Sequence, residues 1–469
     1  MLRNGLLGII VGLALTVGGC GGGGGGEQQD ASAQHDVMQF DVNQSDQGGQ
    51  DDAPVGDNND SFEQAIQMDF TTASQKSGVI NPAGDKDYYK FEGTAGDWIT
   101  VFTEANAQCD GTNMDTVLVL YDSSKTQIAV NDNPSFTCDS YLTTRLAATG
   151  TYYVMIQDYS QYASTDPADW NGGPLFTYKI YLMKLTATTT GVVMDPETGN
   201  DLASAKSTTI PTDAYDTLIG TLASGTDIDV FTFSLSANTS VWIDFDPAGA
   251  EGNGSTSSLG QTYITDAAGT TVIARFDGTL GPGASELSPP LLPGDPTTPI
   301  GYALWVKAPS GSIGSNPFYT ATLIGYTEDN TPEAEAATAT GANDTLATAE
   351  TLVPNAEGRA YTLLHLPDGD VDYLKMPVTA GDLFHVNCGS ATSGSGVQGL
   401  KVSVRNENDA EVASCTEDFT DATIGCGIGW DTDVTVSATG FYYLKFTKTG
   451  QVADVTSNFV RCLIWSETP

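Results

Sequence analysis

The chain contains 469 residues, with 59 acidic side chains, 18 basic side chains and a formal net charge of −41. Because so acidic a chain repels phosphate backbones, we exclude nucleic acid as a partner. The length leaves room for about three domains of ~100 to 200 residues each.

The N-terminus has the pattern of a targeting segment. Arg3 supplies a positive charge, and residues 6–17 form an apolar run of 12 residues, which is too short to span a bilayer. The small residues before Cys20 resemble a bacterial lipobox, which predicts a signal peptide over residues 1–19 and acylation of Cys20. Acyl chains would attach the protein to a membrane of the bacterial cell envelope, at the outer membrane or the cell surface. The alternative is an ordinary secretory signal with a chance cysteine.

The rest of the chain falls into two parts that differ in amino-acid composition. Residues 20–56 are rich in Gly, Gln, Asp and Ser and contain scarcely any large apolar side chain. They cannot bury enough surface to offset the entropy of ordering, so we predict a disordered tether. From residue 57 onward, short alternating apolar segments are separated by Gly, Asn, Asp and Thr, which is typical of antiparallel strands.

One short motif occurs three times in the strand-rich part. Its copies are Gly84-Asp85-Lys86-Asp87, Gly225-Thr226-Asp227-Ile228-Asp229 and Gly369-Asp370-Val371-Asp372. An Asn-Asp pair precedes each copy at a nearly constant distance, namely Asn59-Asp60, Asn200-Asp201 and Asn343-Asp344. A repeat of this size is a whole domain. We therefore predict an all-β chain with three tandem antiparallel, jelly-roll-like β-sandwiches over 57–186, 195–326 and 341–469, with joints at 187–194 and 327–342.

The cysteines indicate an oxidising compartment. Six follow Cys20, two in the first repeat and four in the third, and even numbers per domain favour disulfides. Four cysteines allow three pairings, and their positions relative to the first repeat favour one of them. We predict the pairs Cys109 with Cys138, Cys388 with Cys426, and Cys415 with Cys462. A zinc site is the alternative, although the chain has no Cys-x-x-Cys.

Several motifs of the first repeat occur together and in order. They are the Asn-Asp start, the Gly-Asp-x-Asp-Tyr-Tyr core, Thr94-Ala95-Gly96-Asp97, Leu120-Tyr121-Asp122, Asn131-Asp132 and Gly150-Thr151-Tyr152-Tyr153-Val154. This set resembles the bacterial pre-peptidase C-terminal domain, a β-sandwich module related to the collagen-binding domains of clostridial collagenases. The resemblance covers nearly all of residues 57–182, is good in the third repeat and is weaker in the second. Such domains usually follow a secreted peptidase.

The resemblance also implies calcium, which in the collagen-binding relatives lies between the N-terminal segment and the sandwich. Carried over, the ligands of the first repeat would be Asp57, Asn59, Asp60, Asp85 and Asp87. Those of the third would be Asn343, Asp344, Asp370 and Asp372, with Glu335 as a looser candidate. The weakest set is Asn200, Asp201, Asp227 and Asp229. The chemistry agrees, because Ca²⁺ takes six to eight oxygen ligands and strand residues two apart share a face. The paired core carboxylates are spaced differently in the relatives, and the alternative is that these residues only cap turns.

The sequence contains no recognisable catalytic set. His-Glu-x-x-His, Gly-x-Ser-x-Gly and phosphate-binding loops are all absent, so we expect no enzyme. Tyr159, Tyr162 and Trp170 alternate with polar residues, a composition that suits sugars or extended peptides, unless the rings fold back over the sheet. We predict a non-catalytic surface protein whose modules bind a polysaccharide, matrix protein or other extracellular partner. A carboxylate-dependent hydrolase and a purely structural spacer are the alternatives.

Overall fold

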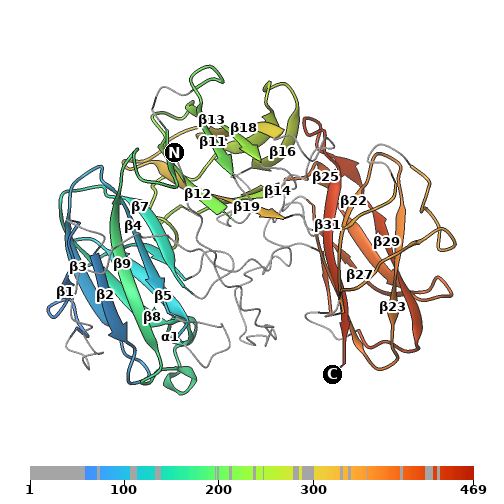
Figure 1. The fold of residues 1–469 in the computed structure, drawn as a ribbon, viewed down its shortest axis with the longest axis horizontal. Coiled ribbons are helices and arrows are strands. Elements are labelled where there is room, and N and C mark those ends of the chain that lie inside the picture. Colours follow the sequence, from blue (N-terminus) through green and yellow to red (C-terminus); the bar gives the residue numbers. More distant parts are fainter. Residues whose placement is uncertain are drawn as a thin grey trace, which may run out of the picture.

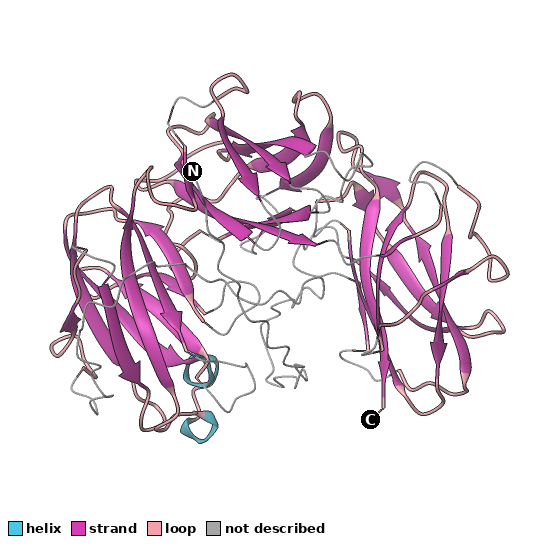
Figure 2. Cartoon of the chain, viewed as in Figure 1, coloured by secondary structure: helices cyan, strands magenta, loops and turns pink. Residues whose placement is uncertain are grey.

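The computed structural model describes most of the strand-rich part of the chain. The described residues are 59–70, 74–105, 114–132, 139–195, 197, 200–210, 214–235, 239–246, 248–277, 285–287, 300–327, 331–335, 340–355, 358–390, 394–417, 426–429 and 434–468. Apart from one 3-10 turn, Pro167–Asp169, and one short helix, α1 (Tyr159–Ala163), the regular elements in these ranges are strands, as Figure 2 shows. The all-β prediction is confirmed.

The first repeat forms two sheets. One contains, in spatial order, β1 (Ile66–Gln67), β3 (Asp87–Gly93), β8 (Gly150–Asp158), β5 (Thr116–Tyr121) and β6 (Gln127–Asn131). The other contains β2 (Ser74–Val79), β9 (Thr177–Leu185), β4 (Trp98–Glu104) and β7 (Tyr141–Arg145).

The second and third repeats reproduce this strand order and add one leading strand, β10 or β20, to the second sheet. One sheet of the second repeat contains, in spatial order, β11 (Lys206–Ile210), β13 (Ile228–Leu235), β18 (Ile300–Lys307), β15 (Gln261–Asp266) and β16 (Val272–Asp277). The other contains β10 (Val192–Met194), β12 (Ala214–Thr221), β19 (Phe318–Thr327), β14 (Thr239–Phe245) and β17 (Ser285–Leu287). One sheet of the third repeat contains β21 (Glu350–Thr351), β23 (Asp372–Val378), β29 (Gly440–Thr447), β26 (Lys401–Arg405) and β27 (Glu411–Thr416). The other contains β20 (Thr331–Pro332), β22 (Arg359–His365), β31 (Phe459–Glu467), β24 (Leu383–Gly389) and β28 (Cys426–Ile428). A small extra pair joins β25 (Val397–Gln398) to β30 (Gly450–Gln451).

Each pair of sheets encloses its own cluster of buried apolar side chains. Side chains alternate between the two faces of a strand, so every second residue of β3 is buried. In the first repeat, Phe91, Leu118 and Leu182 come from three different strands and meet in this cluster with at most 1% of their surface exposed. Burial of one face of each sheet therefore explains why the sequence alternates as it does.

The leading strand of several sheets corrects the expectation of purely antiparallel pairing. The short strands β1, β10, β11, β20 and β21 each pair in parallel with the strand beside them. Two of them, β10 and β20, lie in the segments predicted to be joints. These segments therefore do more than connect the repeats, because they add an edge strand to the sheet that follows.

Neighbouring repeats contact one another directly. Figure 1 shows the second repeat, in green to yellow, between the first and the third. Arg145 of the first repeat donates to the side chain of Asn316 at 2.8 Å, and the Val130 N–H donates to the Gly252 carbonyl at 2.9 Å. On the other side, the Arg275 N–H donates to the Gly394 carbonyl at 2.9 Å. The pairs of sheets are thus stacked on one another and are not clearly separate sandwiches.

Several predictions concern residues outside the described ranges. They include the signal peptide, Cys20, the tether, Asp57 and the Cys109–Cys138 pair. Within the described ranges, no helix combines the length and the apolar character that a membrane crossing needs.

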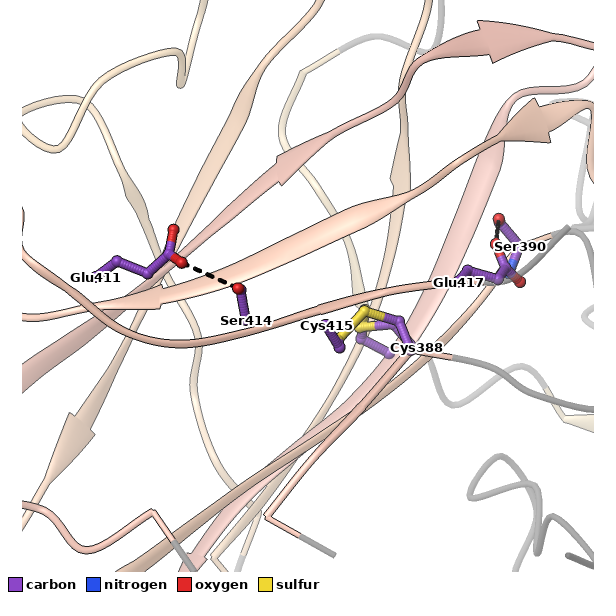
Figure 3. The surroundings of a disulfide bond; sticks show 8 residues. Cys388, Ser390, Glu411, Ser414, Cys415 and Glu417 are labelled. Carbon is purple, nitrogen blue, oxygen red and sulfur yellow. Dashed lines mark hydrogen bonds between the residues drawn. A yellow bond between two sulfur atoms is a disulfide. The ribbon is translucent and has the colours of Figure 1, made fainter. Parts of the chain in front are cut away.

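The disulfides of the third repeat correct the predicted pairing. The bonds join Cys388 to Cys462 and Cys415 to Cys426, with Cα atoms 4.1 and 5.3 Å apart. Cys388 on β24 lies opposite Cys426 on one side and opposite Cys462 on the other, so proximity alone allowed either partner. Cys426 bonds instead to Cys415 of β27, which belongs to the facing sheet. Figure 3 draws Cys415 and Cys388 as sticks, with sulfur in yellow. This second bond therefore links the two sheets across the core.

We expect the two disulfides to differ in their contribution to stability. The Cys388–Cys462 bond closes a sequence separation of 74 residues and the Cys415–Cys426 bond one of 11. Loop-closure entropy then gives about 4 kcal/mol for the first bond and about 3 kcal/mol for the second. Denaturant unfolding of the two double Cys→Ala variants would measure this order. Peptide mapping under non-reducing conditions checks the connectivity, and a Cys388–Cys426 peptide would contradict it.

Candidate metal centre

The acidic residues of the third repeat meet where its leading segment joins the sheets. Asp372 is the first residue of β23, and the Tyr373 N–H donates to the Asn343 carbonyl at 2.9 Å, which holds the Asn-Asp pair against this strand. The leading segment continues β20 into Glu333, whose N–H donates to the Leu363 carbonyl at 2.9 Å. Backbone hydrogen bonds therefore bring residues about forty positions apart in the sequence to one place.

Three carboxylates form the centre of this cluster. One oxygen each from Glu335, Asp344 and Asp370 lies within 4.8 Å of the others, so the three residues could hold a metal ion. Glu335 is 8% exposed and Asp370 is 5% exposed, while Asp344 is half-buried. Within the described ranges, this is the only group of three or more His, Cys, Asp or Glu residues with ligand atoms so close together.

The carboxylates of this cluster have few donors from the protein. Both oxygens of Asp370 and both of Asp372 are buried without a hydrogen-bond partner among the described residues, as is one oxygen of Asp344. Asp372 is 0% exposed. Glu335 accepts from the Ala342 N–H at 2.9 Å. Buried polar atoms without partners are rare in folded proteins, so these oxygens call for a ligand.

Burial and the closeness of the carboxylates raise the pKa of two aspartates in this cluster. Burial raises the pKa of Asp370 to about 6, and repulsion from surrounding carboxylates adds to the shift, while the Val371 N–H opposes it. Burial, followed by repulsion from three neighbouring carboxylates, raises the pKa of Asp372 to about 9, and the nearby Asn343 amide opposes this shift only in part. A divalent cation would relieve both the burial of charge and the repulsion. Because all the candidate ligand atoms are oxygens, the cluster suits a hard divalent cation.

Sequence reasoning missed one member of the cluster and ranked another too low. Glu333 is 8% exposed, and one of its carboxylate oxygens accepts from the His365 N–H at 2.6 Å while the other is buried without a partner in the described ranges. Glu335 was only a looser candidate but belongs to the central trio. The available signal was the Glu-x-Glu spacing next to a short strand, which places both side chains on one face.

The first repeat arranges its corresponding residues differently. Asp85 accepts from the Asn81 N–H at 3.1 Å and from the Lys86 N–H at 2.8 Å, and the buried Asp87 accepts from the Tyr178 hydroxyl at 2.5 Å. Asn59 is buried and its carbonyl accepts from the Tyr88 N–H at 2.8 Å, whereas Asp60 is exposed. With Asp57 outside the described residues, calcium in the first repeat stays a prediction.

The second repeat likewise supplies its core aspartates with protein donors. Asp227 accepts from the Ala223 N–H at 2.6 Å and from the Ile228 N–H at 3.1 Å. Asp229 accepts from the Tyr319 hydroxyl at 2.8 Å. The Asn200 amide also reaches Asp227, at 3.4 Å, and the exposed Asp201 caps a turn through Ser204. In this repeat the turn-capping alternative describes Asp201 well.

The predicted ligand-binding aromatic residues lie around α1 at one end of the first repeat. Tyr162 is 43% exposed, and its ring centroid lies 6.4 Å from that of Tyr159, which packs on the outer face of the sheet. Trp170 is half-buried, donates its indole N–H to the Ser164 carbonyl at 2.8 Å and covers Gly84. Two of the three rings thus fold back, while a binding role for the loop stays a prediction.

Comparison with known proteins supports the family resemblance within the first repeat. Residues 85–158 match the family model of the bacterial pre-peptidase C-terminal domain. A stretch of 98 residues is 31% identical to a probable subtilase-type serine protease of Deinococcus radiodurans, and it spans 21% of this chain and 13% of that protease. The chain thus aligns with a small part of this relative.

Two solved structures show distant similarity. The pre-peptidase C-terminal domain of a Bacillus anthracis collagenase aligns with 25% of this chain over 93% of its own length, with 16% identity and a TM-score of 0.19. A putative secreted protein from Eubacterium rectale aligns with 56% of this chain and 79% of its own, with 12% identity and a TM-score of 0.18.

We expect the buried Asp229 to make stability depend on pH. Burial, followed by repulsion from Asp195, raises its pKa to about 8, while the Tyr319 hydroxyl opposes the shift. Unfolded aspartate titrates near ~3.9, so the folded state holds a proton that the unfolded state releases, and stability falls as the pH rises from about 4 to about 8. Asp229→Asn cannot ionise but still accepts from Tyr319. The free energy of unfolding of this variant should therefore fall less steeply with pH than that of the wild type, and the two slopes should differ by up to about 1.4 kcal/mol per pH unit.

Urea unfolding between pH 4 and pH 8, in the presence of a chelator, measures this difference. The Asp368→Asn variant is the matched control, because the Asp368 side chain is 84% exposed. It should follow the wild type. Equal pH slopes for the wild type and Asp229→Asn would show that Asp229 does not titrate as described.

Proposed function

We propose that this chain is a non-catalytic, secreted protein of the bacterial envelope whose modules are stabilised by calcium and bind an extracellular polysaccharide, matrix protein or other partner. The family match in the first repeat and the disulfides of the third support an extracellular location. The net charge of −41 suits a protein that binds cations.

The shared strand order supports three tandem modules of the pre-peptidase C-terminal type. In all three repeats the second aspartate of the motif lies at the beginning of the second strand of one sheet, in β3, β13 or β23, and the first aspartate lies just before that strand. Each repeat also has its own buried core. The family match covers only the first module, and the proposal extends it to the others through their common topology.

The observation that carries the calcium proposal is the buried trio Glu335, Asp344 and Asp370. Asp372 and Glu333 extend it with further buried oxygens that have no partner among the described residues. Glu333 and Glu335 belong to the segment that leads into the third repeat, whereas Asp372 begins β23 and Asp370 lies in the turn before it. A calcium ion bound here would therefore clamp the leading segment to the sandwich and reinforce its stacking on the second repeat.

Calcium should stabilise the full chain against unfolding. At a free concentration of 100 times its dissociation constant, an ion that binds only the folded state adds about 2.7 kcal/mol. Asp370→Asn, which removes one of the three central carboxylates, should abolish most of this gain. The exposed Asp368→Asn is the matched control and should keep it. Thermal unfolding with calcium and with chelator measures both, and a wild type insensitive to calcium would refute the clamp.

The lipid anchor predicts a change in cell fractionation. Cys20→Ala removes the sulfur that would carry the acyl chains, so the protein should move from the membrane fraction to the soluble fraction. Immunoblotting of both fractions measures the distribution. The chain has no other cysteine before residue 109, so no neighbouring thiol can replace it. If Cys20→Ala partitioned like the wild type, the anchor would be ruled out.

A further inference from the structure

The outer edge of one sheet has the same irregularity in all three repeats. The edge strands are β6 in the first repeat, β16 in the second and β27 in the third. In each of them the register with the neighbouring strand skips one residue, and the skipped residues are Ile128, Ile273 and Val412. An alanine follows each of them in the sequence. The bulge therefore allows the three edges to be compared residue by residue.

The second repeat covers this edge of the first. The Val130 N–H, two residues after the skipped position, donates to the Gly252 carbonyl at 2.9 Å. At the bulge, a Cβ atom added to Gly254 would lie 2.7 Å from the Ile128 carbonyl oxygen, so the two backbones are in close contact. Both glycines lie in the loop that follows β14. This loop thus contacts the edge amide and the bulge together.

The third repeat covers the same edge of the second. The Arg275 N–H, again two residues after the skipped position, donates to the Gly394 carbonyl at 2.9 Å. Gly394 lies in the loop that follows β24, the strand that corresponds to β14 in the sheet order. At the bulge, the Ser457 hydroxyl donates to the Ile273 carbonyl. Ile273 is only 4% exposed as a result of this packing and of its place in the core.

The corresponding edge of the third repeat is open. Among the described residues β27 is the outermost strand of its sheet, and Val412 at the bulge is 42% exposed. Ala413 is half-buried, whereas Ala129 and Ala274 at the same position are 0% exposed. The exposed Ser414 holds the position of the donating edge amide. An open edge strand of this kind is a template for pairing with another chain.

The first repeat exposes the counterpart of the residues that reach back to a preceding repeat. One backbone hydrogen bond recurs before β9, β19 and β31, and its acceptors are the carbonyls of Phe176, Pro317 and Asn458. The residues just before these acceptors are Leu175, Asn316 and Ser457. Asn316 is 5% exposed and bonds to β7 of the first repeat, and Ser457 contacts the bulge of the second. Leu175 is 75% exposed.

The two exposed positions correspond to a contact that already exists within the chain. Between the second and third repeats, Ser457 meets Ile273. Leu175 holds the position of Ser457 in the first repeat, and Val412 holds the position of Ile273 in the third. Both side chains are apolar and exposed, so their contact would remove apolar surface from water. A second copy that stacked on the third repeat as the repeats stack on one another would bring them together.

We propose that the open edge of β27 binds the first repeat of a second copy of this chain, so that copies associate head to tail through Val412 and Leu175. The contact repeats the two interfaces that join neighbouring repeats within one copy. Because it uses two different surfaces, it is heterologous and can continue from copy to copy. Neither the calcium site nor the extracellular ligand of the proposed function depends on it.

Sedimentation equilibrium of the full chain tests this association. A Cys20→Ala background keeps acyl chains from driving it. Each copy carries a net charge of −41, so association should strengthen as salt is raised to about 1 M, where the screening length is about 3 Å. Val412→Asp places a charge in an apolar contact and should weaken association by at least roughly tenfold.

Val353→Asp is the matched control for this variant. Val353 is 85% exposed in the same repeat and follows β21, at the opposite edge of the sheet that ends in β27. The substitution and its added charge are the same, so the control should associate like the wild type. Loss of association in the control as well would show that added charge, and not the β27 edge, is responsible.

Mixing two variants tests the head-to-tail arrangement. Leu175→Asp blocks the other surface and should abolish self-association as Val412→Asp does. Together they retain one intact pair of surfaces, with Leu175 on one chain and Val412 on the other. The mixture should therefore form a one-to-one dimer that does not grow. Both side chains are exposed, so both variants should melt like the wild type.

Three results would overturn the proposal. A wild type that stays monomeric at about 1 M salt would exclude a second copy as the occupant and leave the edge to another partner. Self-association that is lost in Val412→Asp but kept in Leu175→Asp would show two β27 strands pairing edge to edge. Association insensitive to both variants would place the contact on a different surface. None of these results bears on the calcium clamp, which is measured by unfolding.

Discussion

Carboxylates buried at the junction between a leading segment and a sheet are the constraint around which each repeat is built. A buried aspartate lies at the beginning of β3, β13 and β23, and a buried carboxylate must be hydrogen-bonded, protonated or bound to a cation. Asp87 and Asp229 receive a tyrosine hydroxyl, and Asp229 and Asp372 both lie near further carboxylates.

This constraint links local chemistry to the arrangement of the whole chain. The leading segments contribute edge strands to the sheets and lie between consecutive repeats, so whatever holds them also supports the stacking. Contacts such as Arg145 with Asn316, and the Arg275 N–H with the Gly394 carbonyl, then fasten neighbouring repeats. In the third repeat the two disulfides reinforce the same sheets. The disulfides, the contacts between repeats and the acidic junctions therefore all hold the same stacked sheets together.

Much of the fold could be predicted because its signals are local. Strand alternation, turn residues and a motif repeated three times indicate an all-β chain with three related units. The Asn-Asp pairs and paired aspartates also indicated where acidic groups would gather, since both lie close to strand starts. Disulfide pairing could not be predicted in this way, because Cys388 has a cysteine on each neighbouring strand and only the packing selects Cys462.

The sequence by itself determined the all-β class of the fold and the identity of the acidic residues, because each depends on neighbours in the chain. Only the tertiary structure decided which acidic residues from distant segments come together. The donor to Asp87 comes from a residue 91 positions away, and Glu333 reaches the third repeat from a segment predicted to be a joint. Such partners are chosen by strand pairing and burial, which a ranking of the repeats by motif quality could not take into account.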